Sequence, residues 1–102
     1  MLKLEYQYFE GCPNHIQMEN NLKEALKGLE SHVQINYILV ETLEIAKETA
    51  FRGSPTLLID GVDVEDMPAP ATPSLSCRYY PNGVPSVQAI RKKIEGRLRR
   101  EE

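Results

Sequence analysis

Apolar and polar residues alternate along the first segment of the chain, where Leu4, Tyr6 and Tyr8 stand two residues apart. This period is typical of a strand with one apolar face. A period close to that of a helix follows, and it predicts an amphipathic helix over residues 12–30. The apolar stripe of this helix consists of Met18, Leu22, Ala25, Leu26 and Leu29.

A second strand is predicted from Val33 to Val40, where the pattern alternates at first and then becomes continuously apolar. Continuous apolar character is typical of a buried parallel strand. Thr42 is a suitable N-cap for a short helix over residues 43–50. Residues 56–60 form the third predicted strand, and Asp60-Gly61 predicts a hairpin turn into a fourth strand over residues 62–64.

The last predicted helix begins at Pro85 or Ser86 and has its apolar positions at Val87, Ile90, Ile94 and Leu98. The predicted order is therefore β-α-β-α-β-β-α, with a right-handed crossover between the first two strands. We expect an α/β fold with three α/β/α layers around a four-stranded mixed sheet, formed by a single domain over residues 1–102. A long proline-rich loop over residues 65–84 interrupts it, and such loops tend to be functional or mobile.

Composition excludes some classes of function. The net charge of −3 argues against a general nucleic-acid binder. No apolar run approaches the roughly 20 residues that span a bilayer, and the first residues lead directly into a strand pattern without the apolar core of a signal peptide. We therefore expect a cytoplasmic protein, in which two cysteines are more often reactive or metal-binding than a permanent cross-link.

The segment Gly11-Cys12-Pro13-Asn14-His15 is the main candidate for chemistry, because it joins the first strand to the first helix. A helix start presents unpaired N–H groups and the positive end of the helix dipole. Both favour a thiolate, so Cys12 is a candidate nucleophile. Pro13 suits the first helical position. An imidazolium at His15 would stabilise the thiolate, although a solvated surface histidine explains that residue equally well.

Cys77 lies in the long loop and has three interpretations. It could resolve an oxidised Cys12 by forming a disulfide, or complete a two-thiolate site for a soft metal. It could also be a small buried apolar residue. Arg78 could bind a carboxylate, but loop packing with a surface charge explains it better. A solvated turn best explains the acidic group, which consists of Asp60, Asp63, Glu65 and Asp66.

The residues Tyr8–Asn14, Arg52–Thr56 and Ser76–Tyr80, together with the element order, resemble the thioredoxin-fold superfamily. More narrowly, they resemble small thioredoxin-like proteins that are grouped with alkylmercury lyase-related sequences. The resemblance implies that Pro55 is a cis proline whose loop faces Cys12. In that position the backbone beside Pro55 would pair with a bound thiol-containing chain in the manner of a strand. The sequence departs from the superfamily's Cys-x-x-Cys pair, because His15 takes the position of the second cysteine.

These observations predict a thiol–disulfide oxidoreductase-like protein in which Cys12 is the nucleophile, Cys77 the resolving partner and His15 a residue that tunes the thiol pKa. Whether the protein is an enzyme stays open. The candidate substrate-binding residues are Pro13, Ser54, Pro55, Thr56 and Arg78. We expect no cofactor, and a thiol- or disulfide-containing protein or small thiol as partner.

Two alternatives stay open beside this prediction. One is a soft-metal or organomercurial site formed by Cys12 and Cys77. The other is a non-catalytic domain that binds a partner, which could be a second copy of the same chain. We expect neither a nucleic acid nor a membrane among the partners.

Overall fold

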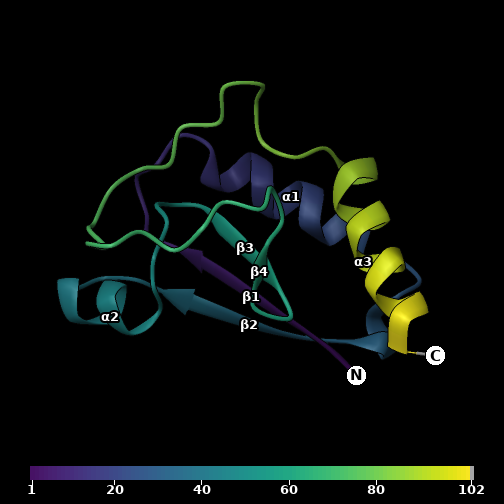
Figure 1. Ribbon diagram of the computed structural model, residues 1–102. Helices are drawn as coiled ribbons and strands as arrows, with labels where there is room; N and C mark the ends of the chain where they lie inside the picture. Colours follow the sequence, from purple (N-terminus) through teal and green to yellow (C-terminus); the bar gives the residue numbers. More distant parts are fainter. Residues whose placement is uncertain (102) are drawn as a thin grey trace.

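Four strands form one mixed sheet, and three α-helices pack against it, in the computed structural model of the protein, which describes residues 1–101. The sheet has the order β2-β1-β3-β4 (Figure 1). The elements are β1 (Leu2–Tyr8), α1 (His15–Ala25), the 3₁₀ helix η1 (Glu30–His32), β2 (Val33–Leu39), α2 (Leu43–Glu48), β3 (Thr56–Ile59), β4 (Val62–Asp63) and α3 (Val87–Glu101).

The central strand β1 pairs with a parallel neighbour on one side and an antiparallel neighbour on the other. The parallel register with β2 runs from Leu2↔Val33 onward, and the antiparallel register with β3 includes Leu4↔Ile59. β4 follows β3 as a short antiparallel hairpin. The predicted α/β class, element order and mixed sheet are confirmed. This arrangement brings the end of β1, where Cys12 follows, next to the start of β3.

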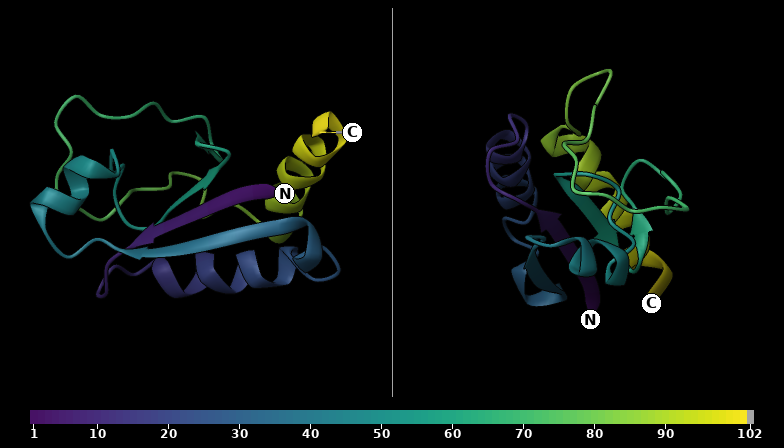
Figure 2. Two further views of the ribbon diagram at one scale, coloured as in Figure 1. Left: turned by 90° about the horizontal axis from the view of Figure 1, so that it is seen from below. Right: turned by 90° about the vertical axis from the view of Figure 1, so that its left-hand side faces the viewer.

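Helices α1 and α3 pack together against one face of the sheet (Figure 2). Alternate residues of β1 point to this face, and helical residues three or four apart meet them. The cluster includes Leu4 and Tyr6 from β1, Met18 and Leu22 from α1, and Ile94 from α3, all 0–1% exposed. The apolar positions predicted for both helices belong to this cluster, although Leu26 and Leu29 follow the end of α1. Burial of this surface supplies the main stabilisation of the fold.

Helix α2 covers only one end of the opposite face. A smaller apolar cluster forms there from Val40, Ala46 and Phe51. Gln7 points to this face, because it alternates with Tyr6, and its amide donates a hydrogen bond to the carbonyl of Thr49 just beyond α2, at 3.1 Å. The predicted third layer therefore consists of one short helix, which lies at the end of the sheet near the cysteines.

Two predictions about individual elements were wrong. Strand β2 is at the edge of the sheet rather than buried, and Tyr37 on it is 45% exposed. The short α2 cannot cover this strand along its length. The first helix ends at Ala25 rather than near residue 30, because Gly28 adopts a positive φ of 84° and the chain turns there.

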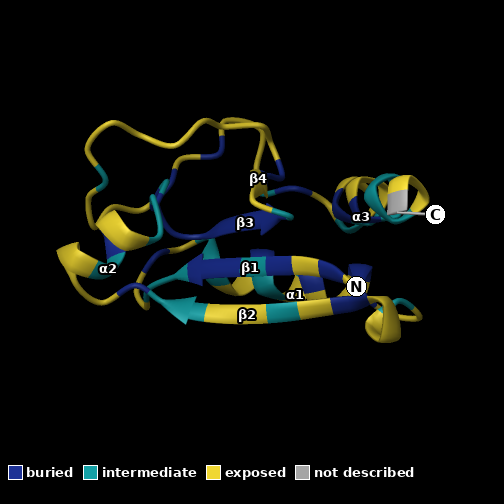
Figure 3. Cartoon of the chain, turned by 60° about the horizontal axis from the view of Figure 1, so that its bottom comes forward, coloured by how far each residue is buried: buried dark blue, intermediate teal, exposed yellow. Residues whose placement is uncertain are grey.

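The connection from β4 to α3 runs over the surface as an exposed strand-free loop, apart from one bridge to residue 54 (Figure 3). Its residues are mostly exposed between positions 65 and 76 and become alternately exposed and buried from 77 to 80. Within residues 1–101, no helix has the length and apolar character to cross a membrane. The second half of this loop is the part that lies against the cysteine turn.

Candidate functional site

Cys12 lies in the turn between β1 and α1 and is only 6% exposed. Its carbonyl oxygen accepts a hydrogen bond from the His15 backbone N–H at 3.2 Å, which is a tight-turn bond. Helical bonding begins only where the carbonyl of Asn14 accepts from the Met18 N–H at 3.1 Å. The predicted helix start at Cys12 was therefore wrong, and Pro13 lies in the turn instead of at the first helical position. Cys12 lies two residues before the cap residue Asn14.

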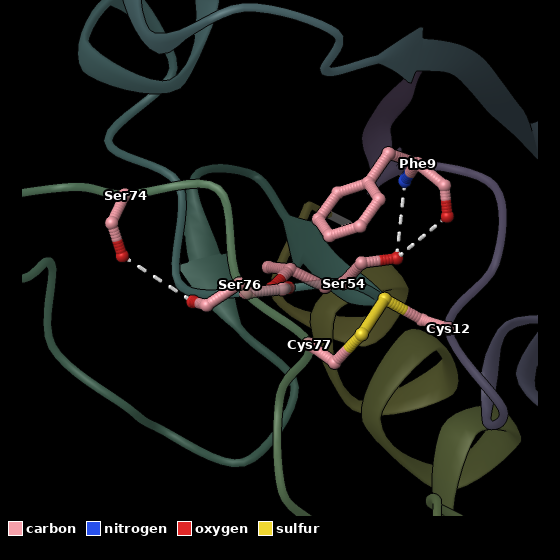
Figure 4. Close-up of a disulfide and its surroundings, with 8 residues drawn as sticks. Phe9, Cys12, Ser54, Ser74, Ser76 and Cys77 are labelled. Atoms are coloured by element: carbon pink, nitrogen blue, oxygen red, sulfur yellow. Dashed lines mark hydrogen bonds between the residues drawn. A yellow bond between two sulfur atoms is a disulfide. The ribbon is translucent and has the colours of Figure 1, made fainter.

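Cys77 forms a disulfide with Cys12 across 65 residues of sequence, with a Cα–Cα distance of 5.6 Å (Figure 4). This distance is within the normal range for a disulfide. Both cysteines of the chain are used in the bond. Cys77 is exposed, so the interpretation as a small buried apolar residue was wrong. The roles as resolving thiol and as second metal ligand both require the proximity that the structure has.

Backbone hydrogen bonds hold Cys77 beside the loop that precedes β3. The Ser54 N–H donates to the Ser76 carbonyl at 2.9 Å, and the Arg78 N–H donates to the Ser54 carbonyl at 2.8 Å. These bonds form a one-residue parallel bridge between Ser54 and Cys77, and the Ser54–Pro55 peptide bond is cis, as the resemblance implies. The protein's own segment 76–78 therefore occupies the backbone groups that we expected a bound thiol-containing chain to use.

Two side-chain hydrogen bonds strengthen this contact. The hydroxyl of Tyr80 donates to the Pro55 carbonyl at 2.5 Å, and burial raises the pKa of Tyr80 far above its ordinary value, so the hydroxyl stays a donor. On the other side, the Ser54 hydroxyl accepts from the Phe9 backbone N–H at 3.1 Å (Figure 4). Ser54 thus ties the segment before Cys12 to the segment around Cys77.

A buried ion pair anchors the loop immediately after Cys77. The Arg78 guanidinium donates two parallel hydrogen bonds to the Asp63 carboxylate, at 2.6 and 2.9 Å, and the two side chains are 2% and 0% exposed. Burial alone would raise the pKa of Asp63, but the hydrogen bonds from Arg78 and from the Glu65 and Met67 N–H groups outweigh it and lower that pKa. Such charge-assisted, bidentate pairs fix geometry strongly. Asp63 therefore holds the loop in place from β4.

Gly53 allows the loop to approach this closely. It has a positive φ of 102°, which side chains with a Cβ rarely adopt. A Cβ built on it would lie 2.9 Å from the Cβ of Arg78 and 3.0 Å from its Cα. A larger residue at position 53 would therefore push the Cys77 segment away from Ser54.

His15 is positioned by tyrosines of β1. Its ring stacks on Tyr8 with centroids 4.5 Å apart, and its Nδ1 lies 3.0 Å from the hydroxyl oxygen of Tyr6. The Tyr6 hydroxyl donates to the His15 carbonyl at 3.0 Å. Burial raises the pKa of Tyr6, so its hydroxyl stays neutral in both of these contacts. The ring is thus fixed on the β1 side of the turn, and its effect on the thiol pKa stays a prediction.

The predicted substrate-binding residues divide into exposed and buried positions. Pro13 is exposed beside Cys12, whereas Ser54, Pro55 and Thr56 are buried under the Cys77 segment. The Thr56 hydroxyl donates to the Gly53 carbonyl at 2.6 Å. The Arg78 guanidinium is paired with Asp63, so this ion pair would have to break before Arg78 could bind the carboxylate of a ligand. A role in substrate binding stays a prediction for all five residues.

Sequence reasoning missed the residues that hold the loop, above all Asp63. Asp63 was assigned to a solvated acidic turn, yet its side chain is buried and paired with Arg78. The prediction of a surface charge for Arg78 was wrong for the same reason, while the alternating burial of Arg78 and Tyr80 agrees with loop packing. A buried Asp–Arg pair across a loop leaves no periodic signal in a single sequence.

Comparisons with solved structures identify the fold. The chain is similar to chloroplastic thioredoxin z, with 17% identity, a TM-score of 0.65 and coverage of 98% of this chain and 80% of that one. It is also similar to thioredoxin-2 of the malaria parasite, a component of a protein secretion machinery, with 10% identity, a TM-score of 0.63 and coverage of 94% and 82%.

A third similar structure is an uncharacterised thioredoxin-like protein from Clostridium perfringens, with 15% identity, a TM-score of 0.59 and coverage of 94% and 70%. No protein-family model matches the sequence, and neither does any curated protein. These similarities show that the chain has the thioredoxin fold, as the sequence predicted. The narrower grouping with alkylmercury lyase-related sequences stays a prediction.

Proposed function

We propose that this protein carries out thiol–disulfide exchange through the Cys12–Cys77 pair. The observation that supports the proposal is the proximity of the two cysteines, which are 65 residues apart in sequence and bonded in the structure. Cys12 lies two residues before the N-cap of α1, and the helix dipole there favours a thiolate. The pair would alternate between disulfide and dithiol, taking up or giving up two electrons in exchange with a partner's thiols.

The arrangement replaces the second cysteine of a Cys-x-x-Cys motif by a cysteine from a distant loop. His15 stands at the position where that second cysteine would be, and Cys77 reaches Cys12 from the other side of the turn. The partner proposed is a protein or small molecule with thiol or disulfide groups. The cytoplasmic location stays a prediction, and in such a reducing compartment the dithiol form would predominate at rest.

The test is reduction of insulin disulfides with dithiothreitol as electron donor. We expect the protein to accelerate reduction, and both Cys12→Ser and Cys77→Ser to lose that acceleration. Ser74→Ala is a matched control, because Ser74 is exposed in the same loop and its side chain bonds only weakly, at 3.4 Å, to Ser76. A wild-type rate equal to that of dithiothreitol alone would contradict the proposal and favour a non-catalytic partner-binding domain.

The same sulfur pair supports a second candidate function, a two-thiolate site for a soft metal ion or an organomercurial. Once reduced, the two thiols remain neighbours because the loop is also held by Ser54 and Asp63, and thiolates prefer soft ions. Titration of the reduced protein with phenylmercuric acetate and with Cu(I) separates the two functions. Tight stoichiometric binding that Cys77→Ser abolishes supports the metal site, and binding unchanged in that variant contradicts it.

A further inference from the structure

The two cysteines of the disulfide differ in their access to solvent. Cys12 is 6% exposed, whereas Cys77 is exposed. Leu75 and Tyr79, each two residues from Cys77 along the loop, are exposed as well, by 45% and 79%. Arg78 points inward to Asp63 instead. Of the two cysteines, Cys77 is therefore the residue that offers more surface to a molecule approaching from solvent.

The fate of a disulfide under attack depends on which sulfur is accessible and which leaves more readily. The sulfur with the lower thiol pKa is the better leaving group. Cys12 lies two residues before the cap residue Asn14, at the end of α1 where the helix dipole favours a thiolate. The greater solvent exposure of Cys77 and the better leaving-group quality of Cys12 therefore favour the same direction of reaction.

We propose that an incoming thiol attacks Cys77 and that Cys12 is the sulfur released, which reverses the roles expected from the sequence. This inference rests on the proposed thiol–disulfide exchange. The incoming thiolate gives its electron pair to the Cys77 sulfur, the Cys12–Cys77 bond breaks, and Cys12 leaves as a thiolate. A second thiolate of the partner then attacks the partner's own sulfur in the mixed disulfide and releases Cys77. The partner dithiol is oxidised to a disulfide, and the Cys12–Cys77 disulfide is reduced.

The reverse reaction gives each cysteine a defined task. The Cys77 thiolate attacks a partner's disulfide and forms the mixed disulfide, and the Cys12 thiolate then attacks the Cys77 sulfur and expels the partner's thiolate. The second step requires Cys77 to stay close to Cys12 while the partner is attached. The backbone bonds to Ser54 and the pair with Asp63 hold the residues on both sides of Cys77 and do not involve its sulfur.

The decisive experiment traps the mixed disulfide in the wild-type protein. The oxidised protein is treated briefly with 2-mercaptoethanol and quenched with acid, the free thiols are blocked with N-ethylmaleimide, and peptides are mapped by mass spectrometry. We expect mercaptoethanol on Cys77 and maleimide on Cys12, with an excess of at least about tenfold over the opposite arrangement. The opposite arrangement, or equal amounts of the two, would overturn the assignment while leaving thiol–disulfide exchange intact. Absence of an adduct at both positions would overturn both proposals.

Single-cysteine variants give a second measurement. Reduced Cys12→Ser, which keeps Cys77, and reduced Cys77→Ser, which keeps Cys12, are each reacted with 5,5′-dithiobis(2-nitrobenzoic acid), and each rate is divided by the rate of the same variant in urea. Burial slows a thiol's reaction with a large reagent. We expect the ratio for Cys77 to exceed that for Cys12 by at least about tenfold. A higher ratio for Cys12 would contradict the assignment.

Discussion

The two cysteines are held by very different parts of the molecule. Cys12 follows the central strand β1 and precedes α1, two elements whose apolar side chains form the main core. Cys77 lies in an irregular loop that is fixed by polar contacts: the backbone of Ser54, the Asp63–Arg78 pair and the Tyr80 hydroxyl. One half of the site therefore depends on non-directional apolar burial and the other on directional hydrogen bonds. The two halves should respond to different mutations and to different solution conditions.

The largest expected effect comes from breaking the buried ion pair. Arg78→Met leaves the Asp63 carboxylate buried without its cation, and removal of one partner of such a pair costs about 3–5 kcal/mol. Urea unfolding of the oxidised protein at neutral pH measures the loss. The double variant Asp63→Leu/Arg78→Met should recover much of it, because no buried charge is left. A single variant as stable as the wild type would show that the pair does not anchor the loop.

A core substitution under the Cys12 half should cost nearly as much but act differently. Leu22 is fully buried between α1 and the sheet, and Leu→Ala at such sites costs about 2–5 kcal/mol. The loss should be the same in the oxidised and the reduced protein, because Leu22 belongs to the apolar cluster of α1, α3 and the sheet, whereas Ser54, Asp63 and Arg78 hold the loop through polar contacts outside that cluster. Urea unfolding in the presence and absence of dithiothreitol measures both, with exposed Lys23→Ala as the control. A loss confined to one redox state would contradict the separation of the two halves.

A smaller effect is expected from Tyr80→Phe, which keeps the ring and removes the hydroxyl that bonds to the Pro55 carbonyl. A buried acceptor left without its donor costs about 1–3 kcal/mol. We expect the loop to become more sensitive to proteolysis in the reduced protein, where the disulfide no longer restrains it. Tyr79→Phe is the matched control, because Tyr79 is 79% exposed. Equal cleavage of the two variants would show that the Tyr80 hydroxyl does not help to hold the loop.

The smallest effect concerns acid. The pKa of Asp63 is lowered in the folded protein from the ordinary value of 3.8. Its contribution to stability is thus complete above about pH 4 and is lost as the pH falls through the lowered pKa. Unfolding free energies of the reduced protein at a series of pH values below 5 should fall less steeply for Asp63→Leu/Arg78→Met than for the wild type. Identical slopes would mean that Asp63 titrates as it does in the unfolded chain.

The sequence predicted the half of the site that consists of regular elements. The alternation of Leu4, Tyr6 and Tyr8 and the stripe from Met18 to Leu26 indicated the strand and helix that flank Cys12. These signals exist because one face of each element is buried, and burial repeats with the period of the backbone. The exact start of α1 was not predictable in this way, since it depends on one turn bond between Cys12 and His15.

The half that holds Cys77 gave weaker signals. An aspartate after a hairpin turn is usually exposed to solvent, so Asp63 did not indicate its partner 15 residues away. The pairing of Ser54 with the Cys77 segment involves backbone atoms, which every residue has. Position 77 was singled out by the chemistry of the cysteine itself and by the resemblance of the segment Ser76–Tyr80. Its contact with Cys12 required the three-dimensional path of the loop.

The exposed stretch from Met67 to Leu75 is suspended between two fixed ends. Asp63 and Arg52 bind the backbone of Met67 at one end, and Ser54 binds the carbonyl of Ser76 at the other. Lengthening a loop between fixed ends adds little to the entropic cost of closing the loop, because this cost grows only with the logarithm of the loop length. This stretch is therefore the natural place to insert an affinity tag or a reporter, and related chains are free to vary in length there without moving either sulfur.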